Sequence, residues 1–190
     1  MARVKLNPAF ASFVGEVGNL VYSMRYGRTY VSEKAEISPK KITEAQMAVR
    51  RRFRQATMYA RTVMADPEAR APYAIAAKAR GMPLQNVAIA DFLNGPSVDQ
   101  IDLSKYTGLA GGMIRIRASD DFDVTGVGVT ISGDEGQPIE RGPAILTSMN
   151  WGRWIYTTTT SVPAGTHIHV EATATDRPGN NSTMSEDMVV

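Results

Sequence analysis

The spacing of apolar residues changes close to the middle of the chain. Before residue 94, the longest patterned segments repeat apolar residues every three or four positions, which is typical of one helix face. From Asp99 onward, apolar and polar residues alternate, which is typical of strands. The sequence Asn94-Gly95-Pro96 lies between the two patterns and favours a turn at a domain boundary. We therefore predict a two-domain α+β protein, with one domain at residues 1–96 and the other at residues 97–190.

The first domain is expected to begin with a β-hairpin. Residues 18–25 and 28–34 favour strands, and Gly27 between them can adopt the positive φ that a tight turn requires. A two-stranded hairpin is only marginally stable alone, so it must pack on the helices of its own domain or pair with another subunit. Both possibilities stay open. For a contact between subunits, we expect self-association through apolar and aromatic residues, namely Val4, Leu6, Phe10, Phe13, Leu20, Tyr22 and Tyr30.

A helical cluster should follow the hairpin. Thr43 and Gln46 form a capping box, which predicts a helix from this point to about Ala65. Two shorter helices are expected after Pro67 and Pro83, because proline is tolerated in the first turn of a helix. The buried stripe of the long helix is expected at Ala45, Val49, Phe53, Ala56, Ala60, Val63 and Met64.

The second domain is expected to be a β-sandwich. Short strand-like runs separated by turn sequences recur after Asp99, and six or seven such strands are typical of two packed antiparallel sheets. Trp154 and Tyr156 alternate on one strand, so both rings should lie on one face, most simply in the core. If one of these rings or that of Trp151 were exposed instead, it could form a platform for a carbohydrate or a receptor.

The two predicted domains carry opposite charge, although the whole chain has a formal net charge of only +2. Residues 1–96 contain 15 Lys and Arg against 7 Asp and Glu, a net charge of +8. Residues 97–190 contain 6 against 12, a net charge of −6. Each copy could therefore attract another copy head to tail. Alternatively, these charges only keep two different domains soluble.

The composition narrows the possible functions. The chain has no cysteine, which excludes disulfides, zinc–thiolate sites and thiol catalysis. No apolar run has the length of a signal-peptide core or of a membrane span, so we expect synthesis in the cytoplasm and no membrane insertion. The motifs of serine hydrolases, zinc proteases and phosphate-binding loops are missing, so we expect neither an enzyme nor a cofactor.

The strongest local charge lies in the long predicted helix. Arg50, Arg51, Arg52 and Arg54 could bind the acidic surface of another protein or the phosphates of a nucleic acid, or they could simply be solvated. No sequence motif for reading bases accompanies them, so nucleic acid is the less favoured partner.

Two groups of residues could hold a metal ion. Carboxylate oxygens are the ligands that calcium prefers, although aspartates in turns also accept hydrogen bonds from their own backbone. The four aspartates that could form such a calcium site are Asp120, Asp121, Asp123 and Asp176. His167 and His169 should project from the same face of a strand, as two ligands of one metal would, but the chain has no third histidine.

Two stretches resemble known protein modules. The sequence from Gly15 to Tyr22, G-E-V-G-N-L-V-Y, is followed by a T-x-x-Q-x-x-x-R-x-x-F pattern from Thr43 to Phe53. Together they resemble the N-terminal module of uncharacterised proteins found in phages, prophages and bacterial genomes. Residues 120–124 and 170–180 are similar to turn and strand segments of bacterial immunoglobulin-like modules. This second resemblance implies an immunoglobulin-like β-sandwich, a type of domain that serves adhesion, spacing or decoration.

These patterns together predict a non-enzymatic structural subunit that self-associates into a repeating assembly. The basic N-terminal module and the acidic sandwich would be complementary surfaces, and the assembly would be a virion component or an extracellular or cell-surface fibre. Its partners would be copies of itself and other virion or cell-surface proteins. Two alternatives stay open: a nucleic-acid-associated protein that contacts phosphates through the Arg-rich helix, and a sandwich protein that binds a carbohydrate or a receptor.

Overall fold

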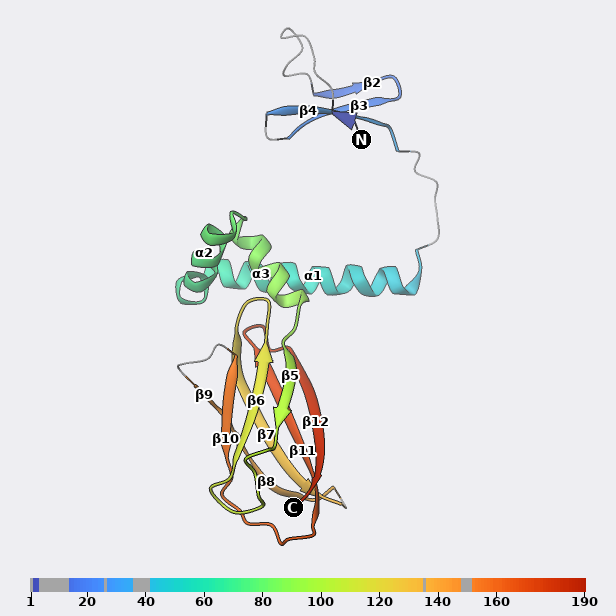
Figure 1. Ribbon diagram of the computed structural model, residues 1–190. Coiled ribbons are helices and arrows are strands. Elements are labelled where there is room, and N and C mark those ends of the chain that lie inside the picture. The colour runs from blue at the N-terminus through green and yellow to red at the C-terminus, as the bar shows by residue number, and fades with distance from the viewer. Residues whose placement is uncertain (1, 4–13, 26, 36–41, 135, 148–151) are drawn as a thin grey trace. The chain divides into compact units, whose positions relative to one another are not determined.

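The computed structural model describes residues 2–3, 14–25, 27–35, 42–134, 136–147 and 152–190 (Figure 1). These residues form three helices and three antiparallel sheets of four strands each, so the protein is of mixed helix and sheet. The chain divides into two compact units, Met1–Thr43 and Glu44–Val190. This division lies between residues 43 and 44 rather than between 96 and 97, because the helices belong to the same compact unit as the C-terminal strands.

The first unit contains a single sheet with the strand order β1-β4-β3-β2. Its strands are β1 (Ala2–Arg3), β2 (Gly15–Val17), β3 (Leu20–Arg25) and β4 (Arg28–Glu33). The predicted hairpin is confirmed, because β3 pairs with β4 and Gly27 in the turn has a φ of +69°. Within residues 14–25 and 27–35, Thr29 is the only buried residue. These strands therefore keep most of their apolar side chains partly or fully exposed.

The second unit begins with the predicted helical cluster. Its helices are α1 (Glu44–Ala65), α2 (Pro67–Arg80) and α3 (Leu84–Leu93). Asp66 separates α1 from α2, because its side chain caps α2 by accepting a hydrogen bond from the Glu68 N–H at 2.9 Å. Gly81 ends α2 in the left-handed conformation, at φ +61°. The helices share a small buried cluster of Ala60, Val63, Tyr73, Ala77, Val87 and Ala88.

Residues 97–190 form a β domain in which two sheets share one core. The first, which we call the β6 sheet, has the order β5-β6-β10-β9. Its strands are β5 (Ser97–Asp102), β6 (Met113–Ser119), β9 (Ile145–Leu146) and β10 (Arg153–Thr157). The second, which we call the β11 sheet, has the order β12-β11-β7-β8. Its strands are β7 (Val124–Gly133), β8 (Pro138–Pro143), β11 (His167–Asp176) and β12 (Asn181–Val189).

The core of the β domain follows from alternation along its strands. Ile114 and Ile116 of β6 are buried while their neighbours are exposed, and Val170 of β11 is buried between partly exposed neighbours. Trp154 and Tyr156 are only 7% and 5% exposed, so the prediction that both rings lie in the core is confirmed. The alternative of an exposed aromatic platform is wrong for these two rings, and Trp151 lies outside the described residues.

The helical cluster packs on one end of the β domain. The Phe122 ring, in the turn between β6 and β7, stacks on the Tyr73 ring of α2 with centroids 4.4 Å apart. Arg80 at the end of α2 donates a hydrogen bond to the Asp121 carbonyl oxygen at 2.5 Å. These contacts explain why the helices and the β domain belong to one compact unit.

Candidate functional site

The N-terminal half of α1 is fully exposed. Every residue from Glu44 to Gln55 is exposed, whereas Ala56, Ala60 and Val63 in the C-terminal half are buried. Figure 1 shows α2 and α3 beside the C-terminal half of α1, with the N-terminal half extending beyond them. At 1.5 Å per residue, α1 spans about 33 Å and α3 only about 15 Å, so α3 cannot cover the whole length of α1.

The apolar stripe of α1 continues from the buried half into the exposed half. Ala45, Val49 and Phe53 follow one another at four-residue spacing and lie on the same helix face as Ala56 and Ala60. Val49 is 69% exposed and Phe53 is 53% exposed. The prediction that these side chains are buried is therefore wrong, because the neighbouring helices end before they reach them. Met64, at the other end of the predicted stripe, is exposed as well.

The four arginines of the predicted basic surface lie on this exposed half but do not form one patch. At about 100° per residue, Arg50 and Arg54 share a face, while Arg51 and Arg52 lie on two others. Arg52 donates a hydrogen bond to the Leu93 carbonyl oxygen at 3.0 Å, where the dipole of α3 favours a cation. Among the described residues, no ion pair joins any of the four to a carboxylate.

The residues assigned to self-association lie on both faces of the N-terminal sheet. The register of β3 and β4 places Leu20 and Tyr22 on one face, together with Val31, and places Tyr30 on the other. Val17 pairs with Leu20 and so joins the first face, which is mainly apolar. The remaining residues of the assigned set lie outside the described residues: Val4, Leu6, Phe10 and Phe13.

The outward face of the β11 sheet carries acidic side chains together with Arg141, which lies opposite Thr130 in the register. Glu171 projects from this face because it alternates with buried neighbours on β11. His169 Nδ1 lies 2.6 Å from Asp187 Oδ1, and His167 Nδ1 lies 2.8 Å from Asp134 Oδ1. The two histidines thus pair with two separate carboxylates, and the structure does not bring them together as ligands of one metal.

The structure does not assemble the predicted calcium site. Asp120 Oδ2 accepts hydrogen bonds from the backbone N–H groups of Phe122 and Asp123, at 2.7 and 2.8 Å, so it closes its own turn. The other three aspartates are held by other side chains, namely Asp121 by Arg80, Asp123 by Arg177 and Asp176 by Asn180. In the part of the chain that the structure describes, no group of three or more His, Cys, Asp or Glu could hold a metal ion.

The helical cluster contains a buried carboxyl group that the sequence patterns did not reveal. Asp91 of α3 is fully buried, and its Oδ2 accepts a short hydrogen bond from the Tyr73 hydroxyl, which in turn lies 2.7 Å from the Tyr59 hydroxyl. Its Oδ1 has no hydrogen-bond partner among the described residues. Burial raises the pKa of Asp91 to about 6, although the Tyr73 hydrogen bond opposes the increase.

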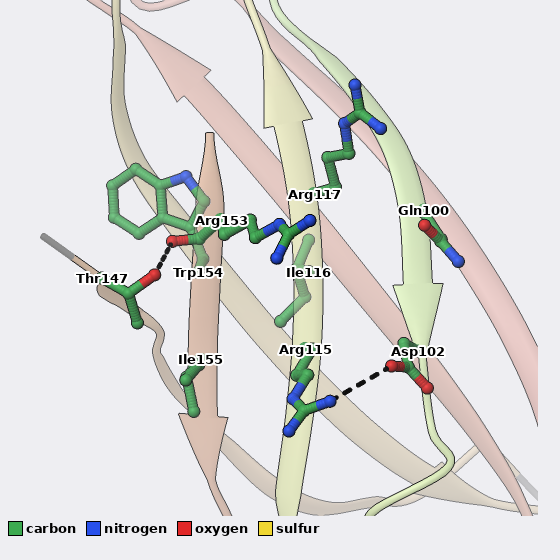
Figure 2. Close-up of a pocket in the computed structure, with 9 residues that line it drawn as sticks. All are labelled: Gln100, Asp102, Arg115, Ile116, Arg117, Thr147, Arg153, Trp154 and Ile155. Carbon is green, nitrogen blue, oxygen red and sulfur yellow. Dashed lines mark hydrogen bonds and ion pairs between the residues drawn. The ribbon is translucent and has the colours of Figure 1, made fainter. Parts of the chain in front are cut away.

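The outward face of the β6 sheet contains a cleft that the sequence patterns did not indicate. Its volume is about 460 Å³, and Figure 2 shows the residues that line it. Three of them are arginines, Arg115 and Arg117 on β6 and Arg153 on β10. The alternation of Arg115 and Arg117 along one strand could have indicated a shared face. The position of Arg153 depends on the register between the strands, which the sequence pattern does not provide.

Comparisons with known proteins do not assign the chain to a family. No protein-family model matches it, and no curated protein matches it. Among solved structures, it is similar to a conjugative transposon lipoprotein from Bacteroides eggerthii, at 14% sequence identity and a TM-score of 0.25. The similarity covers 49% of this chain and 93% of the lipoprotein, and it is too weak to support a conclusion about fold or function.

None of the described helices is both long enough and apolar enough to cross a bilayer.

Proposed function

We propose that the chain is a non-enzymatic structural subunit that self-associates into a repeating assembly through the exposed half of α1. The observation that carries the proposal is the exposure of Val49 and Phe53 on a stripe whose continuation is buried. Burying two such side chains contributes roughly 3 kcal/mol or more. A helix segment of this length is also only marginally stable without packing contacts. A partner on this face would therefore bury the two side chains and also stabilise this half of the helix.

The charges favour a second copy of the chain as that partner. Arg50 and Arg52 flank the stripe, one on each side, and no described carboxylate pairs with either of them. The acidic side chains on the outward face of the β11 sheet, Glu171 and Asp187, offer opposite charge on every copy. A contact between these two different surfaces is heterologous, so each copy can repeat it and build a ring or a filament.

We also propose that the β domain is immunoglobulin-like, which would suit a spacing or decorating role. When its strands are lettered along the chain, the β6 sheet has the order A-B-E-D and the β11 sheet has the order G-F-C-C′. These are the orders of immunoglobulin domains that carry a C′ strand. The two sheets share one core, as the strands of such sandwiches do.

The test compares the oligomeric state of the full chain with that of a variant carrying Val49→Gln and Phe53→Gln. Light scattering and negative-stain electron microscopy at about 50 mM and about 500 mM NaCl separate the apolar and the ionic parts of the contact. We expect the unmodified protein to form regular polymers that weaken at high salt. The variant should remain monomeric because the apolar part of its contact is lost.

The matched control carries Met47→Gln and Met58→Gln, because both side chains are exposed on the opposite side of α1. This control should polymerise as the unmodified protein does. Equal loss of assembly in both variants, or a monomeric unmodified protein under all conditions, would contradict the proposal.

A further inference from the structure

The cleft on the outward face of the β6 sheet concentrates positive charge on an otherwise acidic domain. Arg153 and Arg117 are directly opposite each other on β10 and β6, and Arg115 lies two residues farther along β6. Figure 2 shows the Arg153 side chain reaching over β6 between those of Arg115 and Arg117. Like charges in directly opposite positions of an antiparallel pair destabilise a sheet. The three arginines therefore weaken the free domain, and an anion placed between them would remove that cost.

Nearby carboxylates form loose ion pairs with two of these arginines but accept no hydrogen bond from them. Arg115 Nη1 lies 3.8 Å from Asp102 Oδ2, and Arg117 Nε lies 3.9 Å from Asp99 Oδ2. Both distances exceed those of a charge-assisted hydrogen bond. Arg153 has no ion pair with any carboxylate that the structure describes.

Each carboxylate is also held by serines on its other oxygen. Asp102 Oδ1 accepts a hydrogen bond from the Ser104 N–H at 2.9 Å. Asp99 Oδ1 accepts hydrogen bonds from the hydroxyls of Ser97 and Ser119, at 2.6 and 3.0 Å. The serines thus fix both carboxylates in place, and the guanidinium N–H groups remain available to a ligand.

We propose that this cleft binds an acidic saccharide, with its carboxylate or sulfate groups held by the three arginines. A guanidinium group can bind such oxyanions through two parallel hydrogen bonds. Gln100 and Asp102 line the same cleft and can bind sugar hydroxyls, and Ile155 adds a partly exposed apolar surface for the face of a sugar ring. The cleft volume of about 460 Å³ lies in the range of small-molecule sites.

The lining residues favour a saccharide over a nucleic acid. Proteins that bind single-stranded nucleic acid combine a basic groove with exposed aromatic rings on which bases stack. The aromatic residue that lines this cleft is Trp154, and its side chain is buried in the core of the β domain. A base would therefore find no exposed ring among the lining residues.

The test is isothermal titration calorimetry of the full chain with a galacturonate tetrasaccharide, at about 50 mM NaCl so that screening is weak. A neutral galactose tetrasaccharide and an oligothymidylate are titrated under the same conditions. We expect the acidic tetrasaccharide to bind and the other two to bind at least about tenfold more weakly. Arg153→Gln should lower the affinity for the acidic tetrasaccharide by about tenfold or more, because it removes a charge-assisted contact.

The matched control is Arg141→Gln, which removes an exposed arginine from β8 in the other sheet and changes the net charge equally. It should leave the affinity unchanged. Absence of binding, or equal losses in the two variants, would overturn the proposal, as would equally tight binding of the oligothymidylate. If Arg153→Gln fails to fold by circular dichroism, Arg117→Gln provides the same comparison. Light scattering of the same samples reports assembly separately, because the cleft and α1 are different surfaces.

Discussion

The β domain and the helical cluster belong to one compact unit, but they differ in how completely they cover their own apolar and ionised groups. In the β domain, alternation along the strands buries one face of each sheet in a shared core. In the helical cluster, the apolar stripe of α1 is buried at Ala56, Ala60 and Val63 and exposed at Val49 and Phe53. The strands of the β domain thus cover the inward face of each sheet, although Ile145 and Val189 are exposed, whereas the stripe of α1 runs from a covered half into an uncovered one.

The two regions also treat their buried carboxyl groups differently. Glu140 of β8 accepts hydrogen bonds from the Tyr156 hydroxyl, from the Thr159 N–H and hydroxyl, and from the Thr160 N–H, at 2.6 to 3.0 Å. Burial acts to raise the pKa of Glu140, but these hydrogen bonds outweigh it and hold the pKa below its ordinary value. Asp91 of the helical cluster has only one bonded oxygen, and its pKa is raised. The β domain therefore stabilises the ionised form of Glu140, whereas the helical cluster destabilises the ionised form of Asp91.

The largest expected difference between the regions concerns loss of apolar side chains. Ile116→Ala should lower the free energy of unfolding by about 4 kcal/mol, because it leaves a cavity in the core of the β domain. Val49→Ala should change it by less than about 0.5 kcal/mol, because the side chain is exposed and alanine is the better helix former. Urea unfolding of dilute, monomeric protein measures both values. A large loss for Val49→Ala under these conditions would show that the stripe is covered within the chain itself.

The next effect concerns the bonded carboxylate of the β domain. Glu140→Gln should lower the free energy of unfolding at neutral pH by about 3 kcal/mol. The carboxylate accepts hydrogen bonds on both oxygens, whereas the glutamine side chain has one oxygen and places an NH₂ group against an N–H donor. A lowered pKa adds stability above the unfolded-state pKa near 4.5, and that stability is lost as the pH falls. The difference between the two proteins should therefore shrink in acid. A difference that stays constant below about pH 4 would contradict this assignment.

Much of this architecture could be predicted because local patterns determine local structure. The capping box at Thr43 predicted the start of α1, and Gly27 predicted the turn of the β3–β4 hairpin. Both features lie at the predicted positions. Alternation placed Trp154 in the core. In each case, the residues that determine the structure lie within a few positions of one another.

The candidate sites could not be predicted because they depend on contacts between distant segments. A helical stripe shows which face is apolar, but the lengths of α2 and α3 and their packing decide how much of it is covered. Arg153 joins Arg115 and Arg117 only through the register of β10 on β6. The aspartates of the predicted calcium site suggested metal binding by residue type alone. In the structure, turn N–H groups and the side chains of Arg80, Arg177 and Asn180 hold them instead, although Asp120 Oδ1 has no partner among the described residues.

The smallest effect tests the carboxyl group of the helical cluster. Burial raises the pKa of Asp91 to about 6 from an ordinary value of 3.8, while Asp120 and Asp176 nearby add to the increase and Arg177 opposes it. A raised carboxyl pKa means that the folded state prefers the protonated form. The cost to stability is therefore absent below the unfolded-state pKa, grows as the pH rises, and is complete above about pH 6.

Asp91→Asn removes this ionisation while keeping an oxygen that can accept the Tyr73 hydrogen bond. The stability of the variant relative to the unmodified protein should increase by about 2 kcal/mol as the pH rises from about 4 to about 7. Only the unmodified protein is destabilised by ionisation of a buried carboxyl group. Urea unfolding across this pH range measures the difference. Tyr73→Phe serves as a control, because it removes the hydroxyl group but leaves Asp91 able to ionise, so its stability should still fall as the pH rises. A difference between Asp91→Asn and the unmodified protein that does not change with pH would show that Asp91 ionises as freely in the folded chain as in the unfolded one, and the contrast with Glu140 would then disappear.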